Sequence, residues 1–216
     1  MYRCVIFDLD GTVLNTLDGL ADAGNYALSQ MKLPTHPTES YRYFVGNGIP
    51  KLIERMLPEN ADQPMLEEAH ELFCSYYNIH MNDKTVPYPG IPEVLAQLKE
   101  KGVKLALVSN KAHEFAAEMI ERYFPKTFDA VFGSVEGFPK KPDPYWVLRA
   151  LETLSMKPSE TFYVGDSGVD MQTAHRANLT ACGVLWGFRD RAELKENGAD
   201  LFCNDPQKLF SMITTI

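Results

Sequence analysis

The sequence predicts an α/β fold: a Rossmann-like parallel sheet flanked by helices, interrupted after its first strand by a helical insertion. Two observations predict this fold. Short apolar runs alternate with longer amphipathic segments along most of the chain, as expected for a parallel sheet covered on both faces. The stretch from about residue 15 to 85 breaks that alternation, because it contains helix-like segments and no strand-like run.

The elements of the sheet follow from their apolar runs. Strands are predicted at residues 4–7 (CVIF), 104–109, 129–133, 161–165 and 180–186. Helices are predicted between them at residues 91–101, 112–124, 143–154 and 168–178. Residues 201–204 and 205–214 are expected to add an edge strand and a last helix.

The insertion is predicted to be a domain of its own. Its helices are expected at residues 17–31, 38–45, 49–57 and 64–81, separated by prolines and glycines. The predicted domains are therefore an α/β core of residues 1–15 and 86–216 and a helical domain of residues 16–85. The hinges between them are expected near Thr16 and in the stretch 83–88, and closure about them would exclude water.

Charge and composition exclude some functions. The 216 residues include 21 Lys and Arg against 29 Asp and Glu, for a formal net charge of −8, which disfavours nucleic-acid binding. An anionic substrate would need a local cation. The four cysteines lie far apart without zinc-ligand spacing, so they are expected to be reduced thiols. No apolar run approaches the roughly 18 residues of a membrane span, so no membrane partner is expected and a cytoplasmic location follows by default.

Polar residues follow three of the predicted strands. Asp8 and Asp10 come at the end of the first strand, Ser109-Asn110 at the end of the second, and Asp166 and Asp170 after the fourth. Sites in parallel α/β sheets form at the carboxyl ends of strands. If these strands are neighbours, the four carboxylates converge.

Converging carboxylates repel one another strongly at low dielectric, so such a cluster is stable only if some of them are protonated or a hard cation lies between them. Oxygen ligands of this kind suit Mg²⁺, which a substrate phosphate often completes. The basic counterpart lies in Lys140-Lys141-Pro142, where Pro142 biases Lys141 towards an extended conformation ahead of a helix N-terminus, a place that favours anions.

These motifs together resemble the haloacid dehalogenase superfamily of aspartyl phosphotransferases, in its phosphoglycolate phosphatase-like subgroup. The four motifs are DLDGT at residues 8–12, Ser109-Asn110, Lys141, and GDSGVD at residues 165–170. They occur in the superfamily's order at predicted strand ends. The resemblance covers nearly the whole chain, and the insertion resembles the superfamily's first type of cap domain.

The resemblance implies a role for each core residue. Asp8 would be the nucleophile that forms an aspartyl-phosphate, Asp10 the general acid and base, and Lys141 the cation that offsets their charge. Mg²⁺ would be held by Asp8, the main-chain carbonyl of Asp10 and Asp166. Asp170 would not bind the ion directly; it would contact the residues that do, or reach the ion through a water molecule. The expected substrate-binding residues of the core are Gly11, Thr12, Ser109 and Asn110. Lys111 is expected to be solvated, and no role is derived for His113.

The cap is expected to select the substrate. Gly46-Asn47-Gly48 forms a predicted turn between two helices and resembles the specificity loop of phosphoglycolate phosphatase-like members. Glycines permit close backbone approach to a substrate, and either Arg42 or Lys51 would supply a charge. A Gly-x-Gly between helices is equally often only a loop, so this role is a hypothesis.

The predicted function is Mg²⁺-dependent hydrolysis of a small phosphorylated metabolite, with 2-phosphoglycolate as the first candidate. Pyrophosphate, nucleoside monophosphates and sugar phosphates remain alternatives. So do a β-phosphoglucomutase-like isomerase and a non-catalytic regulator, although Asp10 argues for phosphoryl transfer rather than dehalogenation. A monomer or a small homo-oligomer is expected.

Overall fold

The computed structural model describes residues 2–215 and divides the chain into two compact units. The core unit comprises Met1–Leu14 and Pro87–Ile216, and the helical unit comprises Asn15–Val86. The chain leaves the core unit through β2 (Leu14–Asn15) and returns through β3 (Val86–Pro87), and these two short strands pair. Each unit is described separately below.

The predicted parallel sheet is confirmed in the core unit. Its strand order is β5-β4-β1-β6-β7-β8, and neighbouring strands pair in parallel. The strands are β1 (Cys4–Phe7), β4 (Lys104–Ala112), β5 (Ala130–Ser134), β6 (Thr161–Gly165), β7 (Thr180–Val184) and β8 (Leu201–Cys203).

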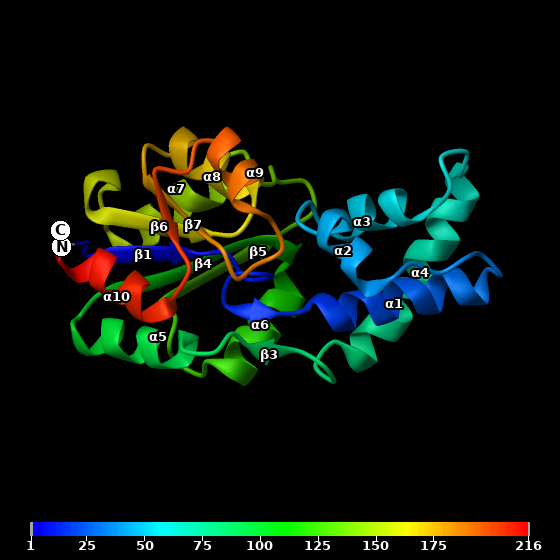
Figure 1. The fold of residues 1–216 in the computed structure, drawn as a ribbon, viewed down its shortest axis with the longest axis horizontal. Helices are drawn as coiled ribbons and strands as arrows, with labels where there is room; N and C mark the ends of the chain where they lie inside the picture. Colours follow the sequence, from blue (N-terminus) through cyan, green and yellow to red (C-terminus); the bar gives the residue numbers. More distant parts are fainter. Residues whose placement is uncertain (1, 216) are drawn as a thin grey trace. The chain divides into compact units, whose positions relative to one another are not determined.

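Helices cover both faces of this sheet, with α7 to α9 on one side and α5, α6 and α10 on the other (Figure 1). These helices are α5 (Ile91–Glu100), α6 (His113–Tyr123), α7 (Tyr145–Leu154), α8 (Gly168–Arg176), α9 (Arg191–Glu196) and α10 (Pro206–Thr215). Alternate residues of β1 serve the two faces: Cys4 and Ile6 join the cluster that contains Val147 of α7 and Met171 of α8. The central strands β1 and β6 are buried along their whole length, because helices cover both of their faces.

The order of the strands creates the site. From β1 the chain adds β4 and β5 on one side of it and then returns to place β6, β7 and β8 on the other. Such a reversal leaves a crevice at the carboxyl ends of the strands where the order changes. The residues that follow β1, β4 and β6 therefore share one edge of the sheet.

Two boundaries and one additional helix illustrate where the structure differs from the expected elements. β4 runs to Ala112 rather than ending at residue 109, because its register against β5 shifts between Val108 and Ala112 and the chain stays extended through that irregularity. Helix α7 begins at Tyr145, two residues later than expected, directly after Pro144. Helix α9 was not expected; Asp190 caps its N-terminus by accepting a hydrogen bond from the Glu193 amide.

The helical unit contains α1 (Leu17–Gln30), α2 (Thr38–Phe44), α3 (Ile49–Met56) and α4 (Gln63–His80). All four lie within two residues of the ranges expected from the sequence. Its interior is aromatic, with Tyr41, Phe73 and Tyr77 almost fully buried. Gly24 on α1 makes room for Tyr41, since a Cβ there would lie 2.4 Å from the Tyr41 hydroxyl.

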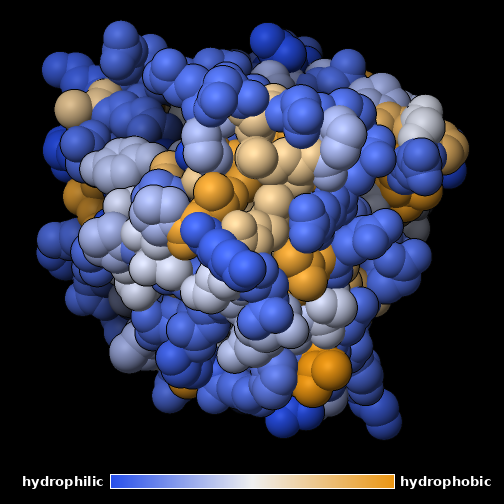
Figure 2. All heavy atoms as spheres, turned by 90° about the vertical axis from the view of Figure 1, so that its right-hand side faces the viewer, coloured by the Kyte–Doolittle hydropathy of each residue, from blue (hydrophilic) through white to orange (hydrophobic). Residues whose placement is uncertain are grey.

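Most of one face of the molecule is hydrophilic, apart from a central apolar area (Figure 2). Among residues 2–215, none of the helices combines the length and the hydropathy that crossing a bilayer requires.

The packing around Gly24 predicts an asymmetric response of α1 to alanine. Gly24→Ala forces its methyl group into the buried Tyr41 ring, so we expect a loss of about 1–3 kcal/mol in the free energy of unfolding. Gly19→Ala on the same helix is the matched control, because its methyl group meets its nearest neighbour at 3.6 Å. That control should gain up to about 1 kcal/mol. Urea denaturation measures both changes, and equal effects at the two positions would contradict this account of the packing.

Candidate active site

Three carboxylates come together at the carboxyl edge of the sheet. Asp8 directly follows β1, Asp166 follows β6, and Asp170 lies in the first turn of α8. One oxygen from each of these side chains lies within 4.8 Å of the others, and all three residues are buried. Among residues 2–215 this is the only such cluster of metal-ligating side chains.

Asp170 is the anchor of the cluster. Its Oδ2 accepts hydrogen bonds from the amide and the hydroxyl of Ser167, at 3.1 and 2.6 Å, in a capping box that begins α8. Its Oδ1 accepts from Lys141 Nζ at 2.7 Å and from the Tyr163 hydroxyl at 3.1 Å. Four hydrogen bonds are about what a carboxylate can accept, so this side chain is held rigidly.

Lys141 lies between two of these acids. Its Nζ is 2.9 Å from Asp8 Oδ1 and 2.7 Å from Asp170 Oδ1. Its backbone is clamped by Asn110, whose side-chain amide donates to the Lys141 carbonyl at 3.1 Å and accepts from the Lys141 amide at 2.8 Å. Of the two adjacent lysines, Lys141 is thus the one that enters the site, whereas Lys140 is exposed.

Asp166 is oriented by residues from two different segments. Its Oδ1 accepts from the Thr12 hydroxyl at 3.2 Å, and its Oδ2 accepts from the Phe188 amide at 2.7 Å. The structure thereby gives the Thr12 hydroxyl a partner other than the expected substrate. Two glycines permit this contact: a Cβ on Gly11 would lie 2.2 Å from Asp166 Oδ2, and one on Gly187 would lie 2.4 Å from the Gly11 carbonyl.

Asp10 has a lysine of its own. Its carboxylate oxygens lie 3.1 and 3.3 Å from Lys111 Nζ. The expectation of a solvated Lys111 is therefore wrong: the side chain is only 3% exposed and forms an ion pair with a residue 101 positions earlier. Ser109, two residues before it, accepts a hydrogen bond from the Lys111 amide at 3.2 Å.

Burial and like charge shift the titration of the acids. Burial, then the charge of Asp170, raises the pKa of Asp8 to about 7, although Lys141 acts in the opposite direction. Burial, then Asp170 and Asp8, holds the pKa of Asp166 well above its usual range. Burial alone would lower the pKa of Lys141, but the two neighbouring acids outweigh it and raise that pKa well above the usual value.

The residues present fit a divalent cation. Asp8, Asp10, Asp166 and Asp170 carry four negative charges when ionised, whereas Lys111 and Lys141 carry two positive charges. One divalent cation balances the difference. In addition, Asp8 Oδ1 is buried and its close polar neighbour is Lys141 Nζ at 2.9 Å, so this oxygen retains a lone pair that a metal could use. All-oxygen donor sets favour hard divalent cations, of which Mg²⁺ is one.

The predicted cap residues lie together around the turn between α2 and α3. Gly46 and Gly48 both have positive φ, 115° and 85°, which favours glycine at each position. Arg55 of α3 stabilises the turn by donating to the Phe44 carbonyl at 2.9 Å and to Asn47 Oδ1 at 2.8 Å. Arg42 on α2 forms an exposed ion pair with Glu39 at 3.5 Å.

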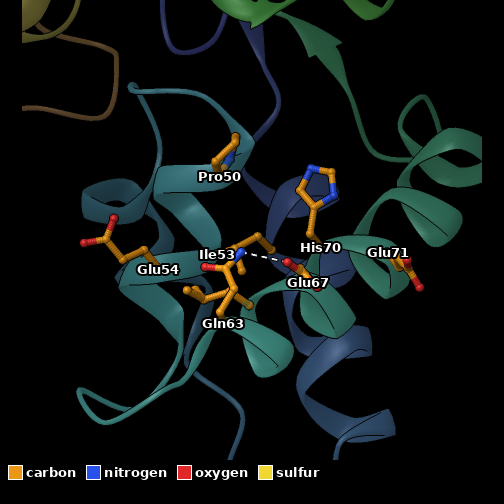
Figure 3. A pocket seen from close by; sticks show the side chains of 8 residues that line it. Pro50, Ile53, Glu54, Gln63, Glu67, His70 and Glu71 are labelled. Carbon is orange, nitrogen blue, oxygen red and sulfur yellow. Dashed lines mark hydrogen bonds between the residues drawn. The ribbon is translucent and has the colours of Figure 1, made fainter. Parts of the chain in front are cut away.

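A hollow within the helical unit lies between α3 and α4 (Figure 3). It has a volume of about 410 Å³. Its lining combines apolar Pro50, Ile53 and Leu66 with the acids Glu54, Glu67 and Glu71. It contains none of the residues that the motifs single out, and Gln63 and Glu67 on its wall hydrogen-bond to each other at 2.8 Å.

Four contributors to these sites were missed from the sequence. Lys111 had a usable signal, since it directly follows Ser109-Asn110 at a strand end. Tyr163 and Phe188 had none, because one is an aromatic within an apolar strand and the other acts through its backbone amide. Arg55 resembles any charged residue on a short helix.

Comparison with known proteins identifies the family of the chain. A family model described as haloacid dehalogenase-like hydrolase matches residues 5–184. The phosphoglycolate phosphatase of Chromobacterium violaceum is 31% identical over 216 residues, covering 98% of this chain and 96% of that protein. The phosphoglycolate phosphatase of Aquifex aeolicus is 33% identical over 187 residues, covering 86% of each chain.

Solved structures show the same fold. A candidate phosphoglycolate phosphatase from Lactobacillus delbrueckii superposes with a TM-score of 0.94 at 32% identity, covering 98% of both chains. A predicted phosphatase from Clostridium acetobutylicum superposes with a TM-score of 0.89 at 27% identity, covering 100% of both chains.

The raised pKa values predict how stability depends on pH and metal. Asp8 and Asp166 bind protons more tightly in the folded state than in the unfolded state, so stability is lost as pH rises through about 7. In EDTA, we expect the melting temperature to fall between pH 5 and pH 8 by at least about 3 °C. Added Mg²⁺ should reverse most of that fall, because the cation replaces the protons.

Scanning calorimetry across this range measures the effect, with Asp8→Asn as the control. The amide of Asn does not titrate, so the melting temperature of this variant should depend less on pH than that of the wild type. If the melting temperature of the wild type changes with neither pH nor Mg²⁺, the proposed repulsion among the buried acids is wrong.

Proposed function

The chain belongs to the haloacid dehalogenase-like hydrolases and is a phosphoric monoester hydrolase, and from this premise we propose that it hydrolyses 2-phosphoglycolate with Mg²⁺ through an aspartyl-phosphate. The observation that carries the proposal is that Asp8 and Asp10, only two residues apart in the sequence, have different partners in the structure. Asp8 lies with Lys141, Asp166 and Asp170, whereas the Asp10 carboxylate pairs with Lys111. This difference in surroundings supports a nucleophilic role for Asp8 and a proton-donating role for Asp10.

In the first step, a carboxylate oxygen of Asp8 attacks phosphorus in line with the ester oxygen. A bond forms between that oxygen and phosphorus while the phosphorus–ester oxygen bond breaks. The departing oxygen keeps the electron pair and takes a proton from Asp10, which releases glycolate. Lys141 offsets the repulsion between the Asp8 carboxylate and the incoming phosphate.

In the second step, Asp10 removes a proton from a water molecule, and the water oxygen attacks the phosphorus of the aspartyl-phosphate. The bond between Asp8 and phosphorus breaks, its electron pair returns to the carboxylate, and inorganic phosphate leaves. Asp10 thereby regains the proton that it gave to the ester oxygen. Ser109 and the main-chain amides near Gly11 and Asn110 are proposed to bind the phosphate oxygens.

We propose that Asp8, Asp166 and the main-chain carbonyl of Asp10 hold the Mg²⁺ ion, which supplies positive charge against the phosphate oxygens. Asp170 is proposed to support these ligands without binding the ion itself, because its two oxygens already accept hydrogen bonds from Lys141, Tyr163 and Ser167. Its part is to hold Lys141 in place.

We propose that the core of residues 1–15 and 86–216 performs the chemistry and that the cap of residues 16–85 selects the substrate. The turn at residues 46–48, its neighbour Arg42, and Arg55 that supports it are the proposed selectivity elements. The proposed location is the cytoplasm, which fits four cysteines without disulfide bonds.

The proposed reaction predicts one preferred phosphate ester. Phosphate release from 2-phosphoglycolate, pyrophosphate, nucleoside monophosphates and sugar phosphates should favour 2-phosphoglycolate, and EDTA should abolish it. Asp8→Asn removes the nucleophile and should lower kcat by at least about a thousandfold while the melting temperature stays close to that of the wild type. Substantial turnover by Asp8→Asn would contradict the mechanism. Equal, weak turnover of the whole panel would contradict the substrate assignment.

The proposed selectivity turn predicts a change in preference without loss of chemistry. Asn47→Ala removes the acceptor for Arg55 and loosens the turn, so the ratio of kcat/KM between 2-phosphoglycolate and the other esters should fall about tenfold. Asn60→Ala, the same substitution in an exposed turn of the same unit, is the control and should change nothing. Identical ratios in both variants would argue against a selective role for the turn.

A further inference from the structure

The strongest unassigned feature of the core is the buried ion pair between Lys111 and Asp10. The ammonium group contacts both carboxylate oxygens almost equally, at 3.1 and 3.3 Å. The Lys111 side chain is 3% exposed and that of Asp10 is 13% exposed. It is distinct from the other buried lysine of the site, since Lys141 contacts Asp8 and Asp170.

The backbone of Lys111 is held firmly. The residue lies in β4 where the register against β5 shifts, and such irregularities re-aim side chains. The Ser109 hydroxyl accepts from its amide at 3.2 Å. Gly133 of β5 permits close packing, because a Cβ there would lie 2.8 Å from the Lys111 carbonyl. The ammonium group is therefore presented from a rigid strand rather than from a loop.

Asp10, by contrast, lies beyond the end of β1, and its contact with Lys111 constrains its carboxylate directly. A general acid has to point at one oxygen of the substrate, and misplacement by about 1 Å can cost about a hundredfold in rate. A buried lysine is costly without a partner, so each member of the pair holds the other. The symmetric contact with both oxygens restricts rotation of the carboxylate.

We propose that Lys111 is a positioning residue that orients Asp10 for proton transfer to and from the reacting oxygens. This inference rests on the proposed function, which makes Asp10 the general acid and base. Lys111 acts through Asp10 and does not touch the substrate. Its loss should therefore lower kcat and leave KM for the substrate unchanged.

The proposal predicts a dependence on the leaving group. An alkyl alcohol such as glycolate needs a proton as it departs, whereas p-nitrophenolate departs without one. The ratio kcat/KM covers the steps up to that departure. Lys111→Met should therefore lower kcat/KM about a hundredfold for the best alkyl phosphate of the panel and less than about fivefold for p-nitrophenyl phosphate.

Three further variants sharpen this test. Lys111→Arg keeps the charge and should restore kcat/KM for the alkyl phosphate to within about tenfold of the wild type. Adding Lys111→Met to Asp10→Asn should cause no further loss beyond about threefold, because both changes remove the same function. Lys104→Met, on the same strand but in an exposed ion pair with Asp129, is the matched control and should be fully active. If Lys111→Met does not fold, Lys111→Gln takes its place.

Three results would overturn the proposal: an equal loss on both leaving groups, a tenfold rise in KM with kcat preserved, or wild-type kinetics in Lys111→Met. The second would make Lys111 a substrate ligand. Failure of the proposed function looks different, because the wild-type protein itself would then release no phosphate from either ester with Mg²⁺ present.

Discussion

The repulsion among four carboxylates at one edge of the sheet is the constraint on which the site depends. Asp8, Asp166 and Asp170 are buried, and Asp10 lies two residues from Asp8. Close negative charges in a medium of low dielectric repel strongly. When all four acids are ionised, Lys111 and Lys141 compensate half of this charge, and a divalent cation would balance the remainder.

Each lysine is tied to its own acid by a different part of the fold. The Asn110 side chain holds the backbone of Lys141 through two hydrogen bonds. The Ser109-Asn110 motif, which was expected to contact the substrate, therefore also positions the Lys141 side chain. Lys111 comes from the irregular end of β4. Because the two lysines are held independently, the two neighbouring acids can take different parts in one reaction.

Two glycines near the site, Gly11 and Gly187, allow the close packing that orients Asp166. Gly11 and Gly187 let two loops approach Asp166 so closely that any side chain at either position would collide with its carboxylate or with the neighbouring backbone. The Phe188 amide and the Thr12 hydroxyl then hold that carboxylate. In the helical unit, Arg55 similarly donates hydrogen bonds to a turn that contains two glycines of positive φ.

The sequence by itself determined the class of fold, the order of its main elements and the acids at the strand ends, because hydrophobic periodicity and strand-end motifs are local properties of the chain. It also singled out Lys141, although it left Lys140 as a rival. Only the tertiary structure decided which acid meets which lysine: Lys111 and Asp10 are 101 residues apart, and Lys141 and Asn110 are 31 apart. Such contacts depend on strand order, register and the bulge in β4, which no local pattern encodes. For the same reason the sequence placed Lys111 in solvent, where the packed sheet buries it.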